Sequence, residues 1–180
     1  VMFTLDTESG FKGVVLINAS YGLGEYVVKG RVTPDQFYVF KDGIKNGFKS
    51  IISRRLGSKE VKLVYANTRP HYSPLLKGEE AAKSSPVRRG QGEVSRGGTK
   101  QEKVKLADQK KFCLTDDEVL QLSKWGMLIE QHYGHPMDIE WAKDGVSGQL
   151  FIVQARSETV RSKVINTIEQ YQLKQKEKGK

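Results

Sequence analysis

The chain has 180 residues, which is enough for one sizeable hydrophobic core or two small ones. Hydrophobic residues make up 37% of it and charged residues 28%, a balance typical of a globular protein rather than a disordered one. It contains no run of about 18 apolar residues, which excludes a membrane-spanning helix. Because the single cysteine, Cys113, cannot form an internal disulfide, the sequence predicts a reducing, cytoplasmic setting.

The net charge of +9 is typical of a nucleic-acid-binding protein, but its distribution favours another interpretation. Residues 69–111 carry 11 Lys and Arg against 5 Asp and Glu, and residues 161–180 carry 6 against 2. Neither segment alternates aromatic with basic residues, as single-strand binders do. We therefore expect two solvated basic stretches and no nucleic-acid partner. A basic module that binds RNA or another partner through residues 69–111 remains the non-enzymatic alternative, and a steep salt dependence of RNA binding would favour it.

The first part of the chain predicts short strands joined by turns. Gly22 and Gly24 predict a tight loop, and residues 25–28 predict a short helix that ends at Gly30. The predicted strands are short runs of apolar or alternating residues at 2–5, 14–18, 37–40 and 61–65.

A predicted insertion separates this part from a predicted helix. From about residue 69 to 105 the periodicity is lost among Gly, Pro and basic residues, which predicts a flexible basic insertion. Thr115 followed by Glu118 three residues later is a capping box. Apolar residues then recur at helical spacing as far as Tyr133, and Gly134 predicts the end of the helix.

The last ordered feature expected from the sequence is a β-hairpin. Residues 137–141 and 150–156 predict its strands, and the Asp-Gly-containing segment 144–148 predicts its turn. The sequence therefore predicts an α/β (α+β) lobe over residues 1–160, with a largely antiparallel sheet and packed helices. Residues 161–180 predict a linker.

Polar residues at alternating positions of the hairpin suggest a site. Asp138 and Glu140 share one face of the first strand, and Gln154 and Arg156 share one face of the second. If the two strands pair these residues on the same side, carboxylate and amide oxygens for a hard cation lie beside a guanidinium that can bind phosphate. A surface hairpin with a wet polar face explains the same pattern. The apolar residues around the four favour an enclosed face, but the residues alone leave both interpretations open.

A second candidate feature is the sequence Gly22-Leu23-Gly24-Glu25. Two glycines allow the backbone to approach a ligand closely, and the start of a helix favours anions. The segment lacks the further residues of a dinucleotide fingerprint or a P-loop, so a tight strand-to-helix turn explains the glycines equally well. Glu25 suits a pocket only if it accepts hydrogen bonds from a ligand hydroxyl or helps to hold a cation.

Several motifs resemble the ATP-binding domain of phosphoenolpyruvate synthases (pyruvate, water dikinases). The similarity covers nearly everything outside residues 68–105, and the last two motifs are the most specific. The motifs are VMFTLDT (1–7), INASYGLGEYVVKG (17–30), PDQFYVF (34–40), PMDIEWAK (136–143) and FIVQAR (151–156).

The resemblance implies part of an ATP-grasp domain that gives the β-phosphoryl group of ATP to a histidine on a separate domain. Its cofactors are Mg²⁺ and ATP, and its overall products are phosphoenolpyruvate, AMP and phosphate. By motif, Glu140 and Gln154 correspond to magnesium and nucleotide ligands, and Arg156 to the catalytic, phosphate-binding arginine. Asp138 and Glu25 correspond to acids of the nucleotide site. Such a set suits phosphoryl transfer, which depends mainly on positioning and charge neutralisation.

The resemblance also implies partners beyond the chain. We expect a phosphohistidine domain and a pyruvate-binding domain in the full-length protein, together with a preceding lobe that supplies further phosphate ligands. We also expect no membrane association, and the full-length protein to form a homo-oligomer. Pyruvate phosphate dikinase and antibiotic or glucan dikinases share this chemistry and are the alternatives. A further alternative is a regulatory fragment that binds a nucleotide but catalyses no reaction. Ser157 replaces an expected proline.

Overall fold

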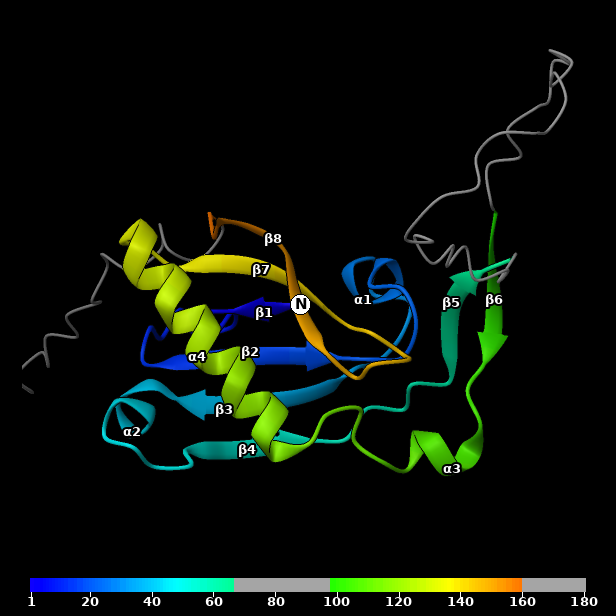
Figure 1. The fold of residues 1–180 in the computed structure, drawn as a ribbon, viewed down its shortest axis with the longest axis horizontal. Helices are drawn as coiled ribbons and strands as arrows, with labels where there is room; N and C mark the ends of the chain where they lie inside the picture. The colour runs from blue at the N-terminus through cyan, green and yellow to red at the C-terminus, as the bar shows by residue number, and fades with distance from the viewer. Residues whose placement is uncertain (67–97, 160–180) are drawn as a thin grey trace, which may run out of the picture.

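A computed structural model describes residues 1–66 and 98–159 of the protein. Its main feature is a six-stranded sheet with the strand order β4-β3-β2-β1-β7-β8, in which every neighbouring pair is antiparallel (Figure 1). This confirms the predicted α/β class and the largely antiparallel sheet. The strands are β1 (Met2–Phe3), β2 (Val14–Ala19), β3 (Asp35–Phe40), β4 (Ile51–Arg55), β7 (Met137–Lys143) and β8 (Leu150–Ser157).

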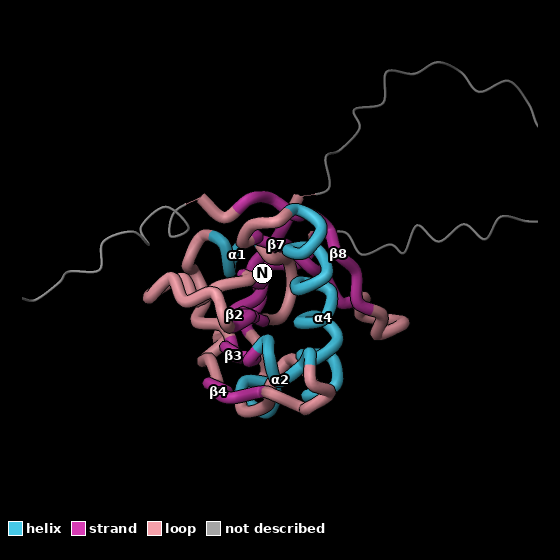
Figure 2. The backbone as a smooth tube through the Cα atoms, turned by 90° about the vertical axis from the view of Figure 1, so that its left-hand side faces the viewer, coloured by secondary structure: helices cyan, strands magenta, loops and turns pink. Residues whose placement is uncertain are grey.

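The short strand β1 joins the two halves of the sheet and marks its core face. Met2 lies opposite Ile17 of β2 and Ile139 of β7, and all three side chains are fully buried. They pack in one cluster with buried residues of helix α4 (Asp116–Tyr133). Figures 1 and 2 show α4 crossing this face of the sheet. Because side chains alternate along a strand, the neighbours of these core residues point to the opposite face.

Helix α4 begins and ends where the sequence predicts. The Thr115 hydroxyl accepts a hydrogen bond from the Glu118 amide (3.3 Å), and the Glu118 carboxylate accepts one from the Thr115 amide (2.9 Å). At the other end Gly134 has φ of +74° and its amide donates to the Glu130 carbonyl oxygen. The capping box and the glycine stop are both confirmed, since each depends on contacts within one turn of the helix.

Replacing the capping threonine should destabilise the lobe modestly. Thr115→Ala removes the acceptor for an amide in the first turn, and we expect the free energy of unfolding to fall by about 1 kcal/mol. Urea denaturation followed by circular dichroism measures this change. Thr33→Ala, at an exposed loop position, is the control and should change stability by less than about 0.5 kcal/mol. Equal unfolding midpoints for the two variants would contradict the role of the cap.

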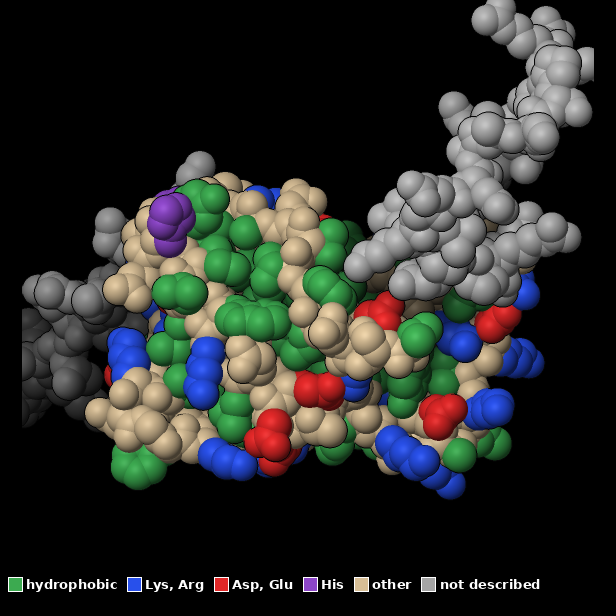
Figure 3. Space-filling model, in the orientation of Figure 1, with side chains coloured by type: hydrophobic (Ala, Val, Ile, Leu, Met, Phe, Trp, Pro, Cys, Tyr) green, Lys and Arg blue, Asp and Glu red, His purple; other side chains and the backbone are tan. Residues whose placement is uncertain are grey.

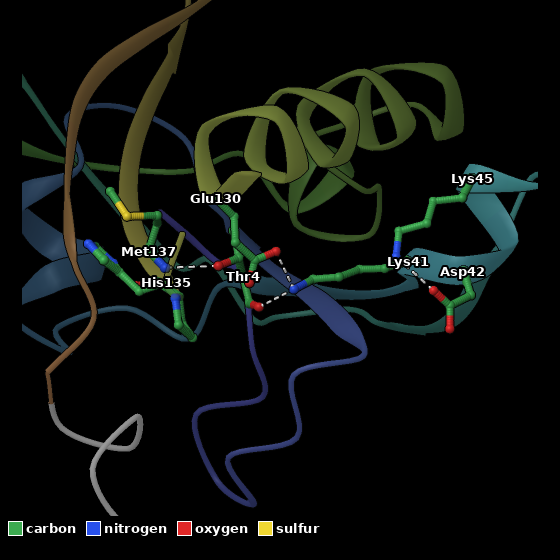
Figure 4. A network of polar contacts seen from close by, with 8 residues as sticks. Thr4, Lys41, Asp42, Lys45, Glu130, His135 and Met137 are labelled. Atoms are coloured by element: carbon green, nitrogen blue, oxygen red, sulfur yellow. Dashed lines mark hydrogen bonds and ion pairs between the residues drawn. The ribbon is translucent and has the colours of Figure 1, made fainter. Parts of the chain in front are cut away.

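Two elements of the sheet region were not predicted. Helix α2 (Lys41–Lys45) follows directly after β3, and β4 follows α2. The Lys41 amine is buried beneath α4 and donates to the Thr4 carbonyl oxygen (2.5 Å) and the Glu130 carboxylate (2.6 Å), as Figure 4 shows. Burial lowers the pKa of Lys41, while the hydrogen bond to Glu130 opposes that shift. These long-range partners fix α2, and the local sequence gave no sign of them.

A second, two-stranded sheet lies beside the main one (Figure 1). We call its antiparallel strands, β5 (Val61–Tyr65) and β6 (Thr99–Lys103), the β5–β6 arm. The predicted insertion at about 69–105 needs correction, because its last residues pair with β5 and are not a loose loop. The alternating residues of β5 did not indicate which strand pairs with them, and the structure shows that this strand is β6. The rest of that insertion and the linker at 161–180 lie outside the described residues. The short helices are α1 (Glu25–Val28) and α3 (Leu106–Gln109).

An apolar hollow of about 360 Å³ lies between α4 and β8. Hydrophobic side chains gather on this side of the molecule, as Figure 3 shows. The hollow is separate from the polar face of the hairpin described below. Among the helices in the described part of the chain, none is long and apolar enough to cross a membrane. Residues lining the hollow are Trp125, Leu128, Ile129, Leu150, Phe151 and Ile152.

Candidate functional site

The β7–β8 hairpin brings the four predicted polar side chains together. Asp138 lies directly opposite Arg156, and Glu140 directly opposite Gln154. Opposite residues of antiparallel strands point to the same face, with their Cβ atoms about 5 Å apart. Ile139, between the two acids, is buried against α4, so the four polar side chains lie on the face of the sheet away from α4. The pairing register of β7 and β8 therefore puts the four polar side chains on one face, which was the condition for a site at this hairpin.

Arg156 and Asp138 form a close ion pair across the two strands. Both Nε and Nη2 of Arg156 contact Asp138 Oδ2, at 2.8 Å and 2.7 Å. The hydrogen bond to Asp138 raises the pKa of Arg156 above its already high ordinary value, so the guanidinium stays charged. The Arg156 side chain is 53% exposed while that of Asp138 is only 15% exposed. Asp138 thus binds one edge of the Arg156 guanidinium and leaves the other edge open to a ligand.

Glu140 and Gln154 form the second row of the hairpin face. Neither side chain makes a hydrogen bond or ion pair with the residues that the structure describes. Within the same residues, no group of three or more His, Cys, Asp or Glu could hold a metal ion. The Glu140 carboxylate and the Gln154 amide oxygen form an incomplete oxygen set, of the kind that Mg²⁺ completes with phosphate oxygens and water.

The glycine turn, residues 22–24, lies at the end of β2. Gly22 has φ of +81°, and a Cβ atom there would lie 2.4 Å from the Leu63 carbonyl oxygen. The next residue, Leu23, donates its amide to that same oxygen (2.8 Å). Only glycine fits this backbone conformation and this close approach without strain. Helix α1 follows as predicted, and it lies on the opposite side of the sheet from α4 (Figure 2), the side of the polar hairpin face.

Glu25 is the one predicted site residue that lies outside the β7–β8 hairpin. Its carboxylate binds Lys29 one turn later (2.5 Å), and the hydrogen bond from Lys29 is the largest cause of its lowered pKa. Within the described residues α1 makes its main contacts with β5 rather than with the hairpin. Glu25 is thus an exposed acid on the same side of the sheet as the polar hairpin face.

Two polar residues that the sequence did not single out belong to this face. Asn18 follows the core residue Ile17, so it lies on the face opposite to α4, in the same row as Glu140 two strands away. Asn18 Oδ1 and the hydroxyl of Ser20 are buried and have no hydrogen-bond partner in the described part of the chain. A buried unsatisfied polar atom is costly, which suits a face completed by a polar ligand. These atoms, with the hairpin oxygens, fit a magnesium-bound phosphate compound. Strand alternation alone could have indicated Asn18.

Comparison with known proteins agrees with this chemistry. The chain matches the family model of the pyruvate phosphate dikinase AMP/ATP-binding domain over residues 1–177. It is 47% identical over 186 residues to phosphoenolpyruvate synthase of Aquifex aeolicus, an alignment that covers 97% of this chain and 18% of that protein. The enzyme of the same name from Pseudomonas aeruginosa is 49% identical over 177 residues, which cover 98% of this chain and 19% of that protein. The phosphoenolpyruvate synthase of Escherichia coli is 46% identical over 163 residues, which cover 91% of this chain and 18% of that protein.

The chain therefore spans about a fifth of the length of the curated relatives that it matches. The family match extends across the sheet, the glycine turn and the polar hairpin. By this match, the chain belongs to the family of pyruvate phosphate dikinase AMP/ATP-binding domains.

Proposed function

We propose that the chain is the part of a phosphoenolpyruvate synthase that binds Mg²⁺-ATP and transfers its β-phosphoryl group to a histidine on another domain. The observation that carries the proposal is the register of β7 and β8, which puts two carboxylates, an amide and an arginine on one open face. The family match supports a dikinase, and the name that the relatives share supports phosphoenolpyruvate synthase among the dikinases.

In this proposal each hairpin residue has its own role. Glu140 and Gln154 supply oxygen ligands for the magnesium ion, which when bound neutralises charge on the phosphates. Arg156 binds the phosphoryl group, for which a planar two-pronged guanidinium is better suited than an ammonium. Asp138 fixes the orientation of Arg156 through the ion pair. Glu25 approaches the nucleotide from the glycine turn. Catalysis then consists of holding the phosphates in place and stabilising their charge.

The overall reaction needs more than this chain. Pyruvate, ATP and water would yield phosphoenolpyruvate, AMP and phosphate, with the phosphohistidine and pyruvate-binding domains of the full-length protein as partners. Assembly as a homo-oligomer in the cytoplasm belongs to the same proposal. The chain's share is the nucleotide half-reaction, which can be measured by itself as phosphorylation of the enzyme by ATP.

The magnesium ligand can be tested by removing one charge. In the full-length protein Glu140→Gln keeps the shape of the side chain but loses a carboxylate, so we expect the Mg²⁺ concentration for half-maximal autophosphorylation to rise by about tenfold or more. The melting temperature in the absence of ligand should stay nearly unchanged, because the Glu140 side chain makes no hydrogen bond or ion pair with the described residues.

The matched control is Glu60→Gln, at an exposed position at the base of the β5–β6 arm. It should leave the magnesium dependence unchanged. An unaltered magnesium dependence in Glu140→Gln would remove Glu140 from the proposed metal site.

A further inference from the structure

A fully buried ion pair lies between the start of β3 and the connection from β4 to β5. The side chains of Asp35 and Lys59 have no exposed surface. The Lys59 amine also donates to the carbonyl oxygens of Gly57 (2.9 Å) and Gln109 (3.2 Å). The Asp35 carboxylate accepts from the amides of Gly57 and Cys113, both at 2.8 Å. We call these five residues the Asp35 cluster. Both buried charges are paired and hydrogen-bonded, as removal from water requires.

The cluster closes the base of the β5–β6 arm. The Gln109 side chain donates to the Val104 carbonyl oxygen (2.9 Å), and the Val104 amide donates to the Glu60 carbonyl oxygen (2.9 Å). Val104 follows β6 and Glu60 precedes β5, so both connections of the arm are fixed there. Lys59 has a φ of +44°, which is unfavourable for a residue with a side chain. The cluster's contacts hold it in that conformation.

A second path leads from the cluster to the glycine turn. Tyr21, directly before Gly22, donates a hydrogen bond to the carbonyl oxygen of Asp108 (3.2 Å), the residue before Gln109 of the Asp35 cluster. Burial raises the pKa of Tyr21 and that of Cys113 to about 12 each. Both groups therefore stay neutral near pH 7, and the Tyr21 hydroxyl keeps the proton that it donates to Asp108. The backbone that enters the glycine turn is thus tied to the residue next to Gln109 of the Asp35 cluster.

The arm holds the other side of the same turn. The Leu23 amide donates to the Leu63 carbonyl oxygen of β5 (2.8 Å). The Tyr26 hydroxyl of α1 donates to the Gln101 side chain of β6 (2.8 Å). The glycine turn and α1 are therefore supported from two directions, by Tyr21 and by the arm, and both supports end at the Asp35 cluster.

We propose that Asp35 and Lys59 are positioning residues that set the distance between the glycine turn and the β7–β8 hairpin. The inference rests on the proposed function, in which a nucleotide is held between these two features. Asp35 belongs to the sheet that carries the hairpin, whereas Lys59 belongs to the connection that carries the arm. Their ion pair joins the main sheet to the connection that carries the arm, together with the bond from the Lys59 amide to the Thr33 carbonyl oxygen. Loosening it shifts the turn relative to the hairpin, and small displacements weaken binding and positioning of phosphates.

The test compares the buried Asp35–Lys59 pair with a partly buried ion pair in the full-length protein. Because Lys59→Met alone leaves a buried carboxylate unpaired, the variant combines it with Asp35→Asn and removes both charges. The matched control combines Lys41→Met with Glu130→Gln, which removes a partly buried pair at the opposite end of β2 from the glycine turn. Steady-state kinetics gives KM for ATP and kcat. Hydrogen exchange of the amides of residues 22–28 reports local order, and melting temperature reports global stability.

We expect KM for ATP to rise by about tenfold in the Asp35/Lys59 variant, with faster amide exchange in residues 22–28. The Lys41/Glu130 variant should lose a similar amount of thermal stability while keeping the wild-type KM and exchange. Equal KM and exchange in the two variants would overturn the positioning role. If the wild-type protein shows no saturable dependence on ATP, the proposed function fails first. A wild-type protein that is saturated by ATP and weakened by Glu140→Gln keeps the proposed function. If the Asp35/Lys59 variant then has a wild-type KM for ATP, only the positioning role fails.

Discussion

Arg156→Lys in the full-length protein is expected to lower the rate of autophosphorylation by ATP about 10²-fold, which corresponds to about 2.7 kcal/mol of transition-state stabilisation. Lysine keeps the positive charge but loses the planar pair of donors. It cannot bind Asp138 with one edge and a phosphoryl oxygen with the other, as the guanidinium can. Single-turnover measurements with ATP labelled in the transferred phosphoryl group measure the effect directly.

Stability should hardly change, because the Arg156 side chain is half exposed. We expect a change in the free energy of unfolding of less than about 0.5 kcal/mol. The matched control is Arg54→Lys, since Arg54 also contacts an aspartate, Asp116, through Nε (3.0 Å) and Nη2 (2.7 Å) but lies away from the hairpin. Arg54→Lys should keep full activity. Normal autophosphorylation in Arg156→Lys would rule out the catalytic role of Arg156.

Gly22→Ala is expected to be among the most destabilising single changes in the lobe. The residue has a φ of +81°, and the new Cβ would lie 2.4 Å from a backbone carbonyl oxygen of β5. The left-handed conformation and the steric overlap together should cost about 2–5 kcal/mol in the free energy of unfolding. Backbone atoms cannot rotate away as a side chain can, so the turn or the arm must move. Urea denaturation measures the cost.

Gly24→Ala is the control two residues further along the same turn. Gly24 has helical angles (φ −60°, ψ −16°), and a Cβ atom there meets no atom within 4 Å. Alanine should therefore be tolerated and should stabilise the lobe by about 0.5 kcal/mol through the unfolded state. Equal unfolding midpoints for Gly22→Ala and Gly24→Ala would show that the close packing of the turn on β5 is not maintained in solution.

The sequence by itself determined the features whose causes are local. Helix α4 has its capping residues at Thr115 and Glu118 and its stop at Gly134, and all three act within one helical turn. The hairpin follows from two apolar runs around an Asp-Gly turn, and alternation along each strand fixed which polar residues share a face. The four hairpin residues could therefore be named before any contact was known, whereas their position on one common face depended on the register of the two strands.

The tertiary structure alone decided the features that depend on distant partners. Lys41 and Lys59 look like ordinary surface lysines in the sequence, but their partners lie 89 and 24 residues away and bury them. The strand at Thr99–Lys103 is polar and has no apolar period, so only its pairing with β5 reveals it. The side of the sheet on which Glu25 lies was likewise decided by packing. Local patterns encode turns, caps and faces, whereas ion pairs and edge strands arise from contacts that no short stretch of sequence contains.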